Sequence, residues 1–258
     1  MTRDPAEGVN ADGVIVTGAA PERIPAGYRP VLTDCTNLLG KVFGDRLHSL
    51  YVYGSVATGQ ARPPRSDLDL MAVWSSETAA DEAAAAATEL SARHAALVRE
   101  VALASSTLVE VLADDRDGLG LRCFLRHYCV WLAGSDLRPS LRPCTPSRAV
   151  ADGFNDDVRA LVKRWRADLD AAHTTAAVAA VARTAARKLL LVTATLESAG
   201  HGGWTTDRAT GADLLATHHP EWAYTARLAV GWCTDPGAPA ARDVRRLLEL
   251  GDWLAARP

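Results

Sequence analysis

One stretch of the chain, residues 51–74, constrains the fold more than any other. Its pattern predicts a strand, a Gly54-Ser55 turn into a short helix, a basic loop, and then a second, apolar strand. Asp67 and Asp69 open the second strand, and side chains two residues apart on a strand point to the same face. Two carboxylates at that spacing repel one another unless a cation lies between them, and their oxygens suit Mg²⁺. The stretch therefore predicts a divalent-metal site at the start of a strand.

The turn at Gly54-Ser55 predicts a phosphate site beside that metal site. The first backbone N–H groups of a helix have no partner within the helix, so they can hold a phosphate. The loop over residues 60–66 carries two prolines and two arginines. Of these, Arg65 either contacts phosphate or stays a solvated counter-charge beside the carboxylates.

These residues resemble the signature of the nucleotidyltransferase superfamily, which includes DNA polymerase β, the aminoglycoside nucleotidyltransferases and the minimal nucleotidyltransferases. The signature is a Gly-Ser pair, a spacer, and an Asp-x-Asp motif that opens a strand, here Gly54-Ser55 and Asp67-Leu68-Asp69. The resemblance implies an enzyme that transfers NMP from a nucleoside triphosphate to a nucleophile and releases pyrophosphate. It also implies that Asp67 and Asp69 are catalytic ligands of Mg²⁺, and that Gly54 and Ser55 hold the β- and γ-phosphates.

The superfamily has a third carboxylate on a neighbouring strand, and Glu110 is the candidate for it. Glu110 is the lone charge in the apolar run over residues 107–112, which we expect to form a buried strand beside Asp67 and Asp69. A buried, unpaired glutamate is costly, so it needs a metal, a partner or a proton. The corresponding residue is a general base in aminoglycoside adenylyltransferases and a metal ligand in polymerases. We expect Glu110 to be the general base, and an additional contact with the metal stays open. The alternative is that its side chain faces water.

Length and composition permit a globular enzyme. The 258 residues, 48% of them hydrophobic, are enough to bury a sizeable core. The net charge of −3 disfavours a long nucleic acid as partner but leaves local basic patches open. No apolar run reaches the roughly 20 residues of a membrane span, and no signal peptide is recognisable. Five cysteines without a C-x-x-C pair indicate buried thiols in a reducing cytoplasm.

The pattern along the chain predicts an α+β protein with two domains. Residues 1–26, rich in Gly, Ala, Pro and Asp, are expected to form a loose N-terminal leader. Residues 27–145 carry helical and strand patterns and match a mixed-sheet nucleotidyltransferase domain. Residues 146–258 carry only helical patterns and predict an all-α bundle. Its expected helices span residues 149–171, 174–199, 209–217, 220–232 and 239–255.

A basic helix lies in the predicted bundle. Arg183 and Arg187 are four residues apart and share one face, and Lys188 is offset by one residue. The string from Arg187 to Arg208 resembles a stretch in uncharacterised bacterial nucleotidyltransferases of this architecture. The resemblance implies that Arg187 or Lys188 reaches the triphosphate across an interdomain cleft. The chain departs from the best-known aminoglycoside enzymes in this region, where a lysine contact to the nucleotide is either missing or replaced by Arg208. A basic helix edge in solvent is the alternative.

The sequence therefore predicts a cytoplasmic, Mg²⁺-dependent nucleotidyltransferase that uses ATP to adenylylate a hydroxyl of a small molecule. An aminoglycoside-like acceptor, and with it antibiotic resistance, is the leading expectation. Asp114 and Asp115 either dock a polycationic acceptor or are merely solvated, and Trp204 either stacks on a base or sugar or belongs to the core. Two other functions stay open: a toxin-type nucleotidyltransferase that modifies tRNA or protein, and a non-catalytic nucleotide-binding module.

Overall fold

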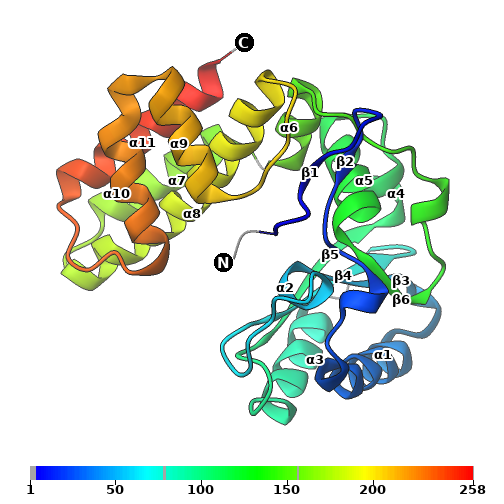
Figure 1. Ribbon diagram of the computed structural model, residues 1–258. Coiled ribbons are helices and arrows are strands. Elements are labelled where there is room, and N and C mark those ends of the chain that lie inside the picture. The colour runs from blue at the N-terminus through cyan, green and yellow to red at the C-terminus, as the bar shows by residue number, and fades with distance from the viewer. Residues whose placement is uncertain (1–3, 78–79, 156, 258) are drawn as a thin grey trace. The chain divides into compact units, whose positions relative to one another are not determined.

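The computed structural model describes residues 4–77, 80–155 and 157–257 (Figure 1). Contacts divide the chain into two compact units, Met1–Thr145 and Pro146–Pro258. The first unit holds a mixed β-sheet with helices and the second is helical, so the predicted α+β class is confirmed. Within the described residues, no helix is both long enough and apolar enough to cross a membrane.

Four strands form the main sheet of the first unit: β3 (Leu47–Tyr53), β4 (Leu68–Trp74), β5 (Val101–Thr107) and β6 (Val130–Gly134). Their spatial order is β5-β4-β3-β6, with β4 and β5 parallel and the other pairs antiparallel. The two predicted strands, one before the Gly54-Ser55 turn and one opened by the Asp67-x-Asp69 motif, are confirmed as β3 and β4. Both strands are apolar along nearly their whole length because they occupy the middle of the sheet and are covered on both faces.

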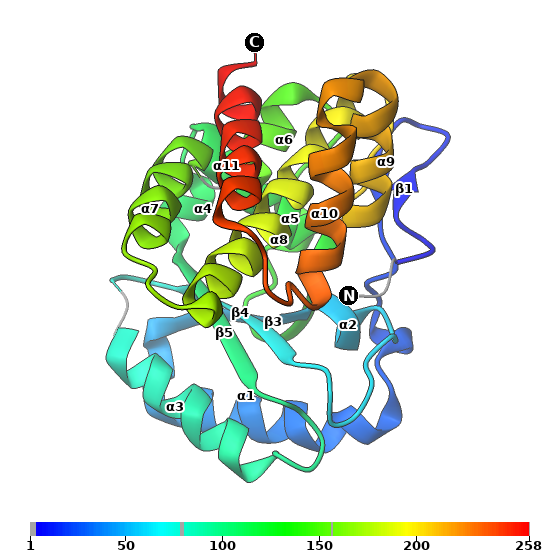
Figure 2. The same cartoon turned by 90° about the vertical axis from the view of Figure 1, so that its left-hand side faces the viewer.

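Helices cover the two faces of this sheet unequally. Helices α1 (Arg29–Phe43) and α3 (Ala80–Arg93) lie side by side on one face, as Figure 2 shows, and pack on a core that includes Leu50 and Leu70. On the other face, α4 (Leu108–Leu112) and α5 (Arg116–Tyr128) pack on Tyr51 and Met71. Alternation along β4 puts Asp67 and Asp69 on the same face as Met71.

The N-terminal segment is not loose over its described part. Strands β1 (Gly8–Val9) and β2 (Ile15–Val16) form a small antiparallel hairpin. Ile15 is fully buried, and its backbone N–H donates to the carbonyl oxygen of Cys144 at 2.9 Å. The prediction of a loose leader is therefore wrong from residue 4 onward, because Ile15 of the hairpin is buried and its backbone is bonded to Cys144.

The remaining elements are short. The 3₁₀ turns are at Pro21–Arg23, Ala26–Tyr28, Gly44–Arg46, Arg138–Ser140 and Pro220–Trp222, and a single α-helical turn, α2, spans Gly54–Ala57.

The second unit is built around one long helix, α8 (Thr175–Gly200), which contacts each of the other α-helices of its unit (Figure 2). Those helices are α6 (Arg148–Phe154), α7 (Val158–Asp170), α9 (Arg208–His218), α10 (Ala223–Thr234) and α11 (Ala241–Ala256). The alanines and leucines of α8 are buried on several sides, which suits a central position in a bundle. The single helix predicted over residues 149–171 is instead two, because the Asn155 amide donates back to the Ala151 carbonyl and Asp157 caps a new start.

Candidate active site

The candidate site of the first unit lies at one end of the sheet strands, where β3 ends and β4 and β5 begin (Figure 1). Tyr53, the last residue of β3, pairs with Asp69 across the antiparallel ladder. On the other side, Asp69 pairs with Ala102 of the parallel strand β5. Three chain segments therefore meet at the Asp67-x-Asp69 motif, and α2 begins at the same point.

Gly54 fits closely against Asp69. The residue has a φ of +68°, a backbone conformation that a side chain makes costly, and a Cβ built on it would overlap a carboxylate oxygen of Asp69. The ring of Tyr53 is next to the same carboxylate, and burial together with the charge of Asp69 raises the pKa of the Tyr53 hydroxyl. The turn thus needs glycine both for its backbone angle and for the space that the carboxylate occupies.

Asp67 has the features expected of a metal ligand. Its side chain is 20% exposed, and among the described residues its buried Oδ1 atom has no hydrogen-bond partner. The other oxygen, Oδ2, accepts a hydrogen bond from the guanidinium of Arg99. A buried carboxylate oxygen without a partner beside a second carboxylate is a hard, anionic donor set that fits Mg²⁺. Asp67 and Asp69 are therefore the residues that would hold the ion.

A third carboxylate, which the sequence analysis missed, lies beside Asp67. Glu100 directly precedes β5, and its carbonyl oxygen accepts the backbone N–H of Leu68 at 2.9 Å, which continues the parallel register to Asp67 and Glu100. By alternation Glu100 is on the face that carries Asp67. The Nη2 atom of Arg99, which contacts Asp67, is also 4.0 Å from Glu100 Oε1. One guanidinium therefore bridges the two carboxylates, and Asp67 raises the pKa of Arg99.

The structure corrects the placement of Glu110. The run over residues 107–112 is not a strand: β5 ends at Thr107, and Glu110 is on helix α4. Glu110 forms a capping box with Thr107, in which Glu110 Oε2 accepts the Thr107 backbone N–H at 2.7 Å and Thr107 Oγ1 accepts the Glu110 N–H at 3.2 Å. Hydrogen bonds from the Ser106 hydroxyl and the Thr107 backbone hold the pKa of Glu110 below its ordinary value, and its side chain is exposed.

Register explains why Glu110 is remote from the aspartates. Asp69 pairs with Ala102 at one end of the β4–β5 ladder, and Trp74 pairs with Thr107 at the other. The two pairs are five residue steps apart along the strand, which is about 17 Å at 3.3 Å per residue. Glu110 is in the first turn of α4 at the far end and does not adjoin the Asp67-x-Asp69 motif.

Two further predicted phosphate ligands belong to this part of the chain. Ser55 is the second residue of α2, directly after Gly54, and is half-buried. Arg65 is exposed in the loop before Asp67, where its backbone N–H donates to the Arg62 carbonyl at 2.7 Å. An arginine that contacts Asp67 is Arg99, which directly precedes Glu100.

The predicted basic residues of the second unit gather around one surface hollow of about 280 Å³. Its lining residues are Arg183, Thr184, Arg187, Lys188, Leu191 and Arg208. Arg208, the first residue of α9, donates through Nε to the Arg187 carbonyl oxygen at 2.7 Å, so the two arginines are held together. Burial lowers the pKa of Arg208, which marks the charge as partly desolvated. A partly desolvated cluster of cations suits an anionic ligand.

The predicted acceptor residues have local structural roles. Asp115 caps α5 by accepting the Gly118 backbone N–H at 2.8 Å, and Asp114 is exposed in the same turn. Trp204 is only 3% exposed and packs edge-to-face on Phe154 at a centroid separation of 5.7 Å. Of the two alternatives for Trp204, the ring therefore lies in the core of its unit.

Comparisons with known proteins place the fold. Neither family models nor curated proteins match this chain. Among solved structures, the chain is similar to the spectinomycin adenyltransferase AAD(9) of Enterococcus faecialis, crystallised with ATP and spectinomycin. The TM-score is 0.55, the sequence identity is 14%, and the match covers 86% of this chain and 98% of that one. The likeness is one of fold.

Proposed function

We propose that this protein is a Mg²⁺-dependent nucleotidyltransferase that transfers AMP from ATP to a hydroxyl of a small molecule and releases pyrophosphate. The observation that supports it best is the convergence of Asp67, Asp69 and Glu100 at the sheet edge beside Gly54. The similarity of the fold to that of a nucleotidyl-transferring enzyme gives independent support.

Each residue of this group has a distinct role in the proposed reaction. Asp67 and Asp69 hold Mg²⁺, which when bound neutralises charge on the phosphate oxygens. Glu100 is half-exposed at the mouth of the site and takes the proton of the acceptor hydroxyl as general base, the role that Glu110 was expected to have. Gly54 lets the backbone approach the carboxylates and the phosphates closely, and Ser55 orients the β- and γ-phosphates.

The basic hollow of the second unit has the chemistry to bind phosphate oxygens of the nucleotide. Arg187, Lys188 and Arg208 supply several N–H donors around a space of about 280 Å³. Charge-assisted hydrogen bonds from such donors are stronger than neutral ones. We assign this hollow to nucleotide binding rather than to the chemical step.

A hydroxyl-bearing small molecule of the aminoglycoside class is the proposed acceptor, with antibiotic resistance as the consequence. The similar structure was determined with ATP and spectinomycin. In this chain, Asp114 remains the exposed candidate for contact with a cationic acceptor, whereas Asp115 is a helix cap and Trp204 is buried. A cytoplasmic location stays a prediction from the cysteines.

The test is transfer of label from α-labelled ATP to a panel that includes aminoglycosides, spectinomycin, tRNA and the protein itself. We expect Mg²⁺-dependent labelling of a small molecule and release of pyrophosphate. Asp67→Asn and Asp69→Asn should abolish it, because an amide is a poor ligand for a hard cation, while Asp12→Asn on the exposed hairpin turn should not. Labelling of tRNA or protein alone would identify the toxin-type activity, and full activity of either aspartate variant would refute the metal assignment.

A further inference from the structure

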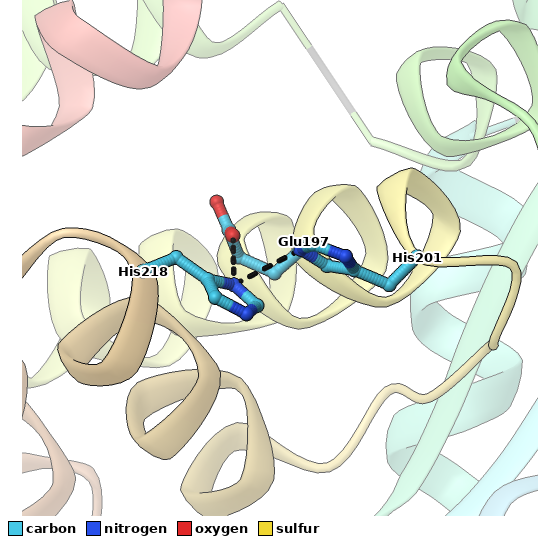
Figure 3. A group of neighbouring side chains, drawn as sticks. All are labelled: Glu197, His201 and His218. Atoms are coloured by element: carbon cyan, nitrogen blue, oxygen red, sulfur yellow. Dashed lines mark hydrogen bonds and ion pairs between the residues drawn. The ribbon is translucent and has the colours of Figure 1, made fainter.

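A second group of metal-ligating side chains lies in the helical unit, away from the residues assigned to the reaction. Glu197 is on α8, His201 follows the end of α8, and His218 is the last residue of α9 (Figure 3). Glu197 and His201 are four residues apart and therefore share one side of the helix. His218 comes from the neighbouring helix and points into the same space, as Figure 3 shows.

The distances within this group match those around a tetrahedral metal ion. His218 Nδ1 is 3.2 Å from Glu197 Oε2, and His201 Nε2 is 3.1 Å from His218 Nδ1. All three ligand atoms lie within 4.8 Å of one another. A zinc ion with bonds of about 2.0–2.1 Å in tetrahedral geometry holds its ligand atoms about 3.3 Å apart. Two of the three separations are therefore already close to those around a tetrahedral ion, and the third is no longer than 4.8 Å.

Hydrogen bonding alone does not satisfy the group. His218 Nδ1 carries at most one proton but faces two acceptors, Glu197 Oε2 and His201 Nε2. If His218 Nδ1 carries the proton, it donates to Glu197 Oε2 and has no proton for His201 Nε2; if it does not, His201 Nε2–H can donate to it, and Glu197 Oε2 receives no proton from His218. A dication at the centre would use the lone pairs of all three atoms at once.

The surroundings hold Glu197 in position. Its side chain is only 2% exposed, and Oε1 accepts a hydrogen bond from Arg257 and is 3.7 Å from His219 Nε2. Arg257 in turn lies over the ring of Trp253. These contacts fix Oε1 and leave Oε2 directed at the two exposed histidines, as outer contacts do in metal sites.

We propose that Glu197, His201 and His218 form a binding site for a transition-metal dication of the zinc class, with a fourth position open to water. Two imidazoles and one carboxylate select such an ion over Mg²⁺ or Ca²⁺, which prefer oxygen ligands only. The ion crosslinks the C-terminal ends of α8 and α9. It thereby holds the two ends of the intervening segment together. The site shares no residue with the proposed nucleotidyl-transfer site and does not depend on it.

The test is a titration of the chelator-treated full-length protein with Co²⁺, followed by visible absorbance, in excess Mg²⁺. We expect one Co²⁺ per chain, with the intense absorption of tetrahedral coordination. Zn²⁺ should displace this Co²⁺, and Mg²⁺ should not.

His201→Ala and His218→Ala should each lower the Co²⁺ affinity by at least about 10–100-fold, because the loss of a residue that only contacts a ligand already has an effect of that size. His173→Ala, at an exposed position before α8 in the same unit, is the matched control and should bind like the wild type. Equal affinity in all three variants, or displacement by Mg²⁺, would overturn the site.

A thermal measurement keeps the proposal testable if an alanine variant is poorly folded. Zn²⁺ should raise the melting temperature of the wild type and of His173→Ala, because an ion that binds only the folded state stabilises it. Glu197→Gln, which preserves the shape of the buried side chain, should lose that shift while its circular dichroism spectrum is unchanged. A wild-type melting temperature that Zn²⁺ leaves unchanged would show a hydrogen-bonded cluster and no metal site.

Discussion

The carboxylate of Asp69 lies directly against the Cα atom of Gly54, in the space that a Cβ would fill. The contact joins the first residue of α2 to the motif that opens β4. Because Tyr53 and Asp69 are paired in the antiparallel ladder, the sheet itself brings the turn and the carboxylate together. The Gly-Ser turn and the Asp-x-Asp motif are therefore one structural unit.

The first prediction concerns this contact. Gly54→Ala should lower transfer activity severely, because the new methyl group displaces the Asp69 carboxylate in addition to straining a φ of +68°. Gly13→Ala is the control, since Gly13 has a φ of +77° and nothing within 4 Å of an added Cβ. Both variants should lose about 1–2 kcal/mol of folding free energy from backbone strain in urea denaturation, but only Gly54→Ala should lose activity. Equal activities would remove the steric argument.

The second prediction separates the two candidate glutamates. Glu100→Gln should lower turnover by roughly 10²–10⁴-fold, the usual effect of removing a positioned general base, with ATP affinity close to that of the wild type. Glu110→Gln should leave turnover unchanged, because Gln also completes a capping box at the far end of β5. Single-turnover rates and ATP calorimetry measure the two quantities. The opposite pattern would restore Glu110 to the chemistry.

The third prediction uses the lowered pKa of Glu110. A carboxylate with a lowered folded-state pKa stabilises the protein above its unfolded-state pKa of about 4.3 and loses that effect as the pH falls through the folded-state value. Glu110→Ala should therefore cost about 0.3–1 kcal/mol at neutral pH, the usual contribution of an exposed carboxylate in the first turn of a helix. The difference from the wild type should shrink as the pH falls below about 4. Urea denaturation across that pH range measures it, and a difference independent of pH would mean that the ionised cap contributes nothing.

The fourth prediction concerns the basic hollow. Arg187→Gln and Lys188→Gln should each weaken ATP binding by about 1–3 kcal/mol in calorimetry, because each removes charge-assisted donors from the hollow. Arg242→Gln, whose side chain is 88% exposed on α11, should leave ATP affinity unchanged. If the hollow variants bind ATP like Arg242→Gln, the hollow does not contact the nucleotide.

Local sequence pattern determined much of the fold. The apolar runs over residues 47–53 and 68–74 could bury both faces only as central strands, and the helical periodicity after residue 146 left no strand to form. Once this segment is a strand, Asp67 and Asp69 lie on one face of the sheet, because side chains on a strand alternate with a period of two. These features depend on neighbours along the chain.

The identity of the third carboxylate depended on strand register, which no local pattern contains. Glu110 is the lone charge within the run over residues 107–112, and that local pattern predicts a buried strand residue, whereas Glu100 only precedes a strand. In the folded chain a capping box with Thr107 turns that run into a helix, and the parallel pairing of Leu68 with Val101 sets Glu100 beside Asp67. No local pattern predicts the meeting of Glu197, His201 and His218 either, because α8 and α9 come together only through packing in the bundle. The sequence by itself therefore determined which segments form strands and helices, and the tertiary structure decided which charged residues meet, because those contacts depend on register and packing between distant segments.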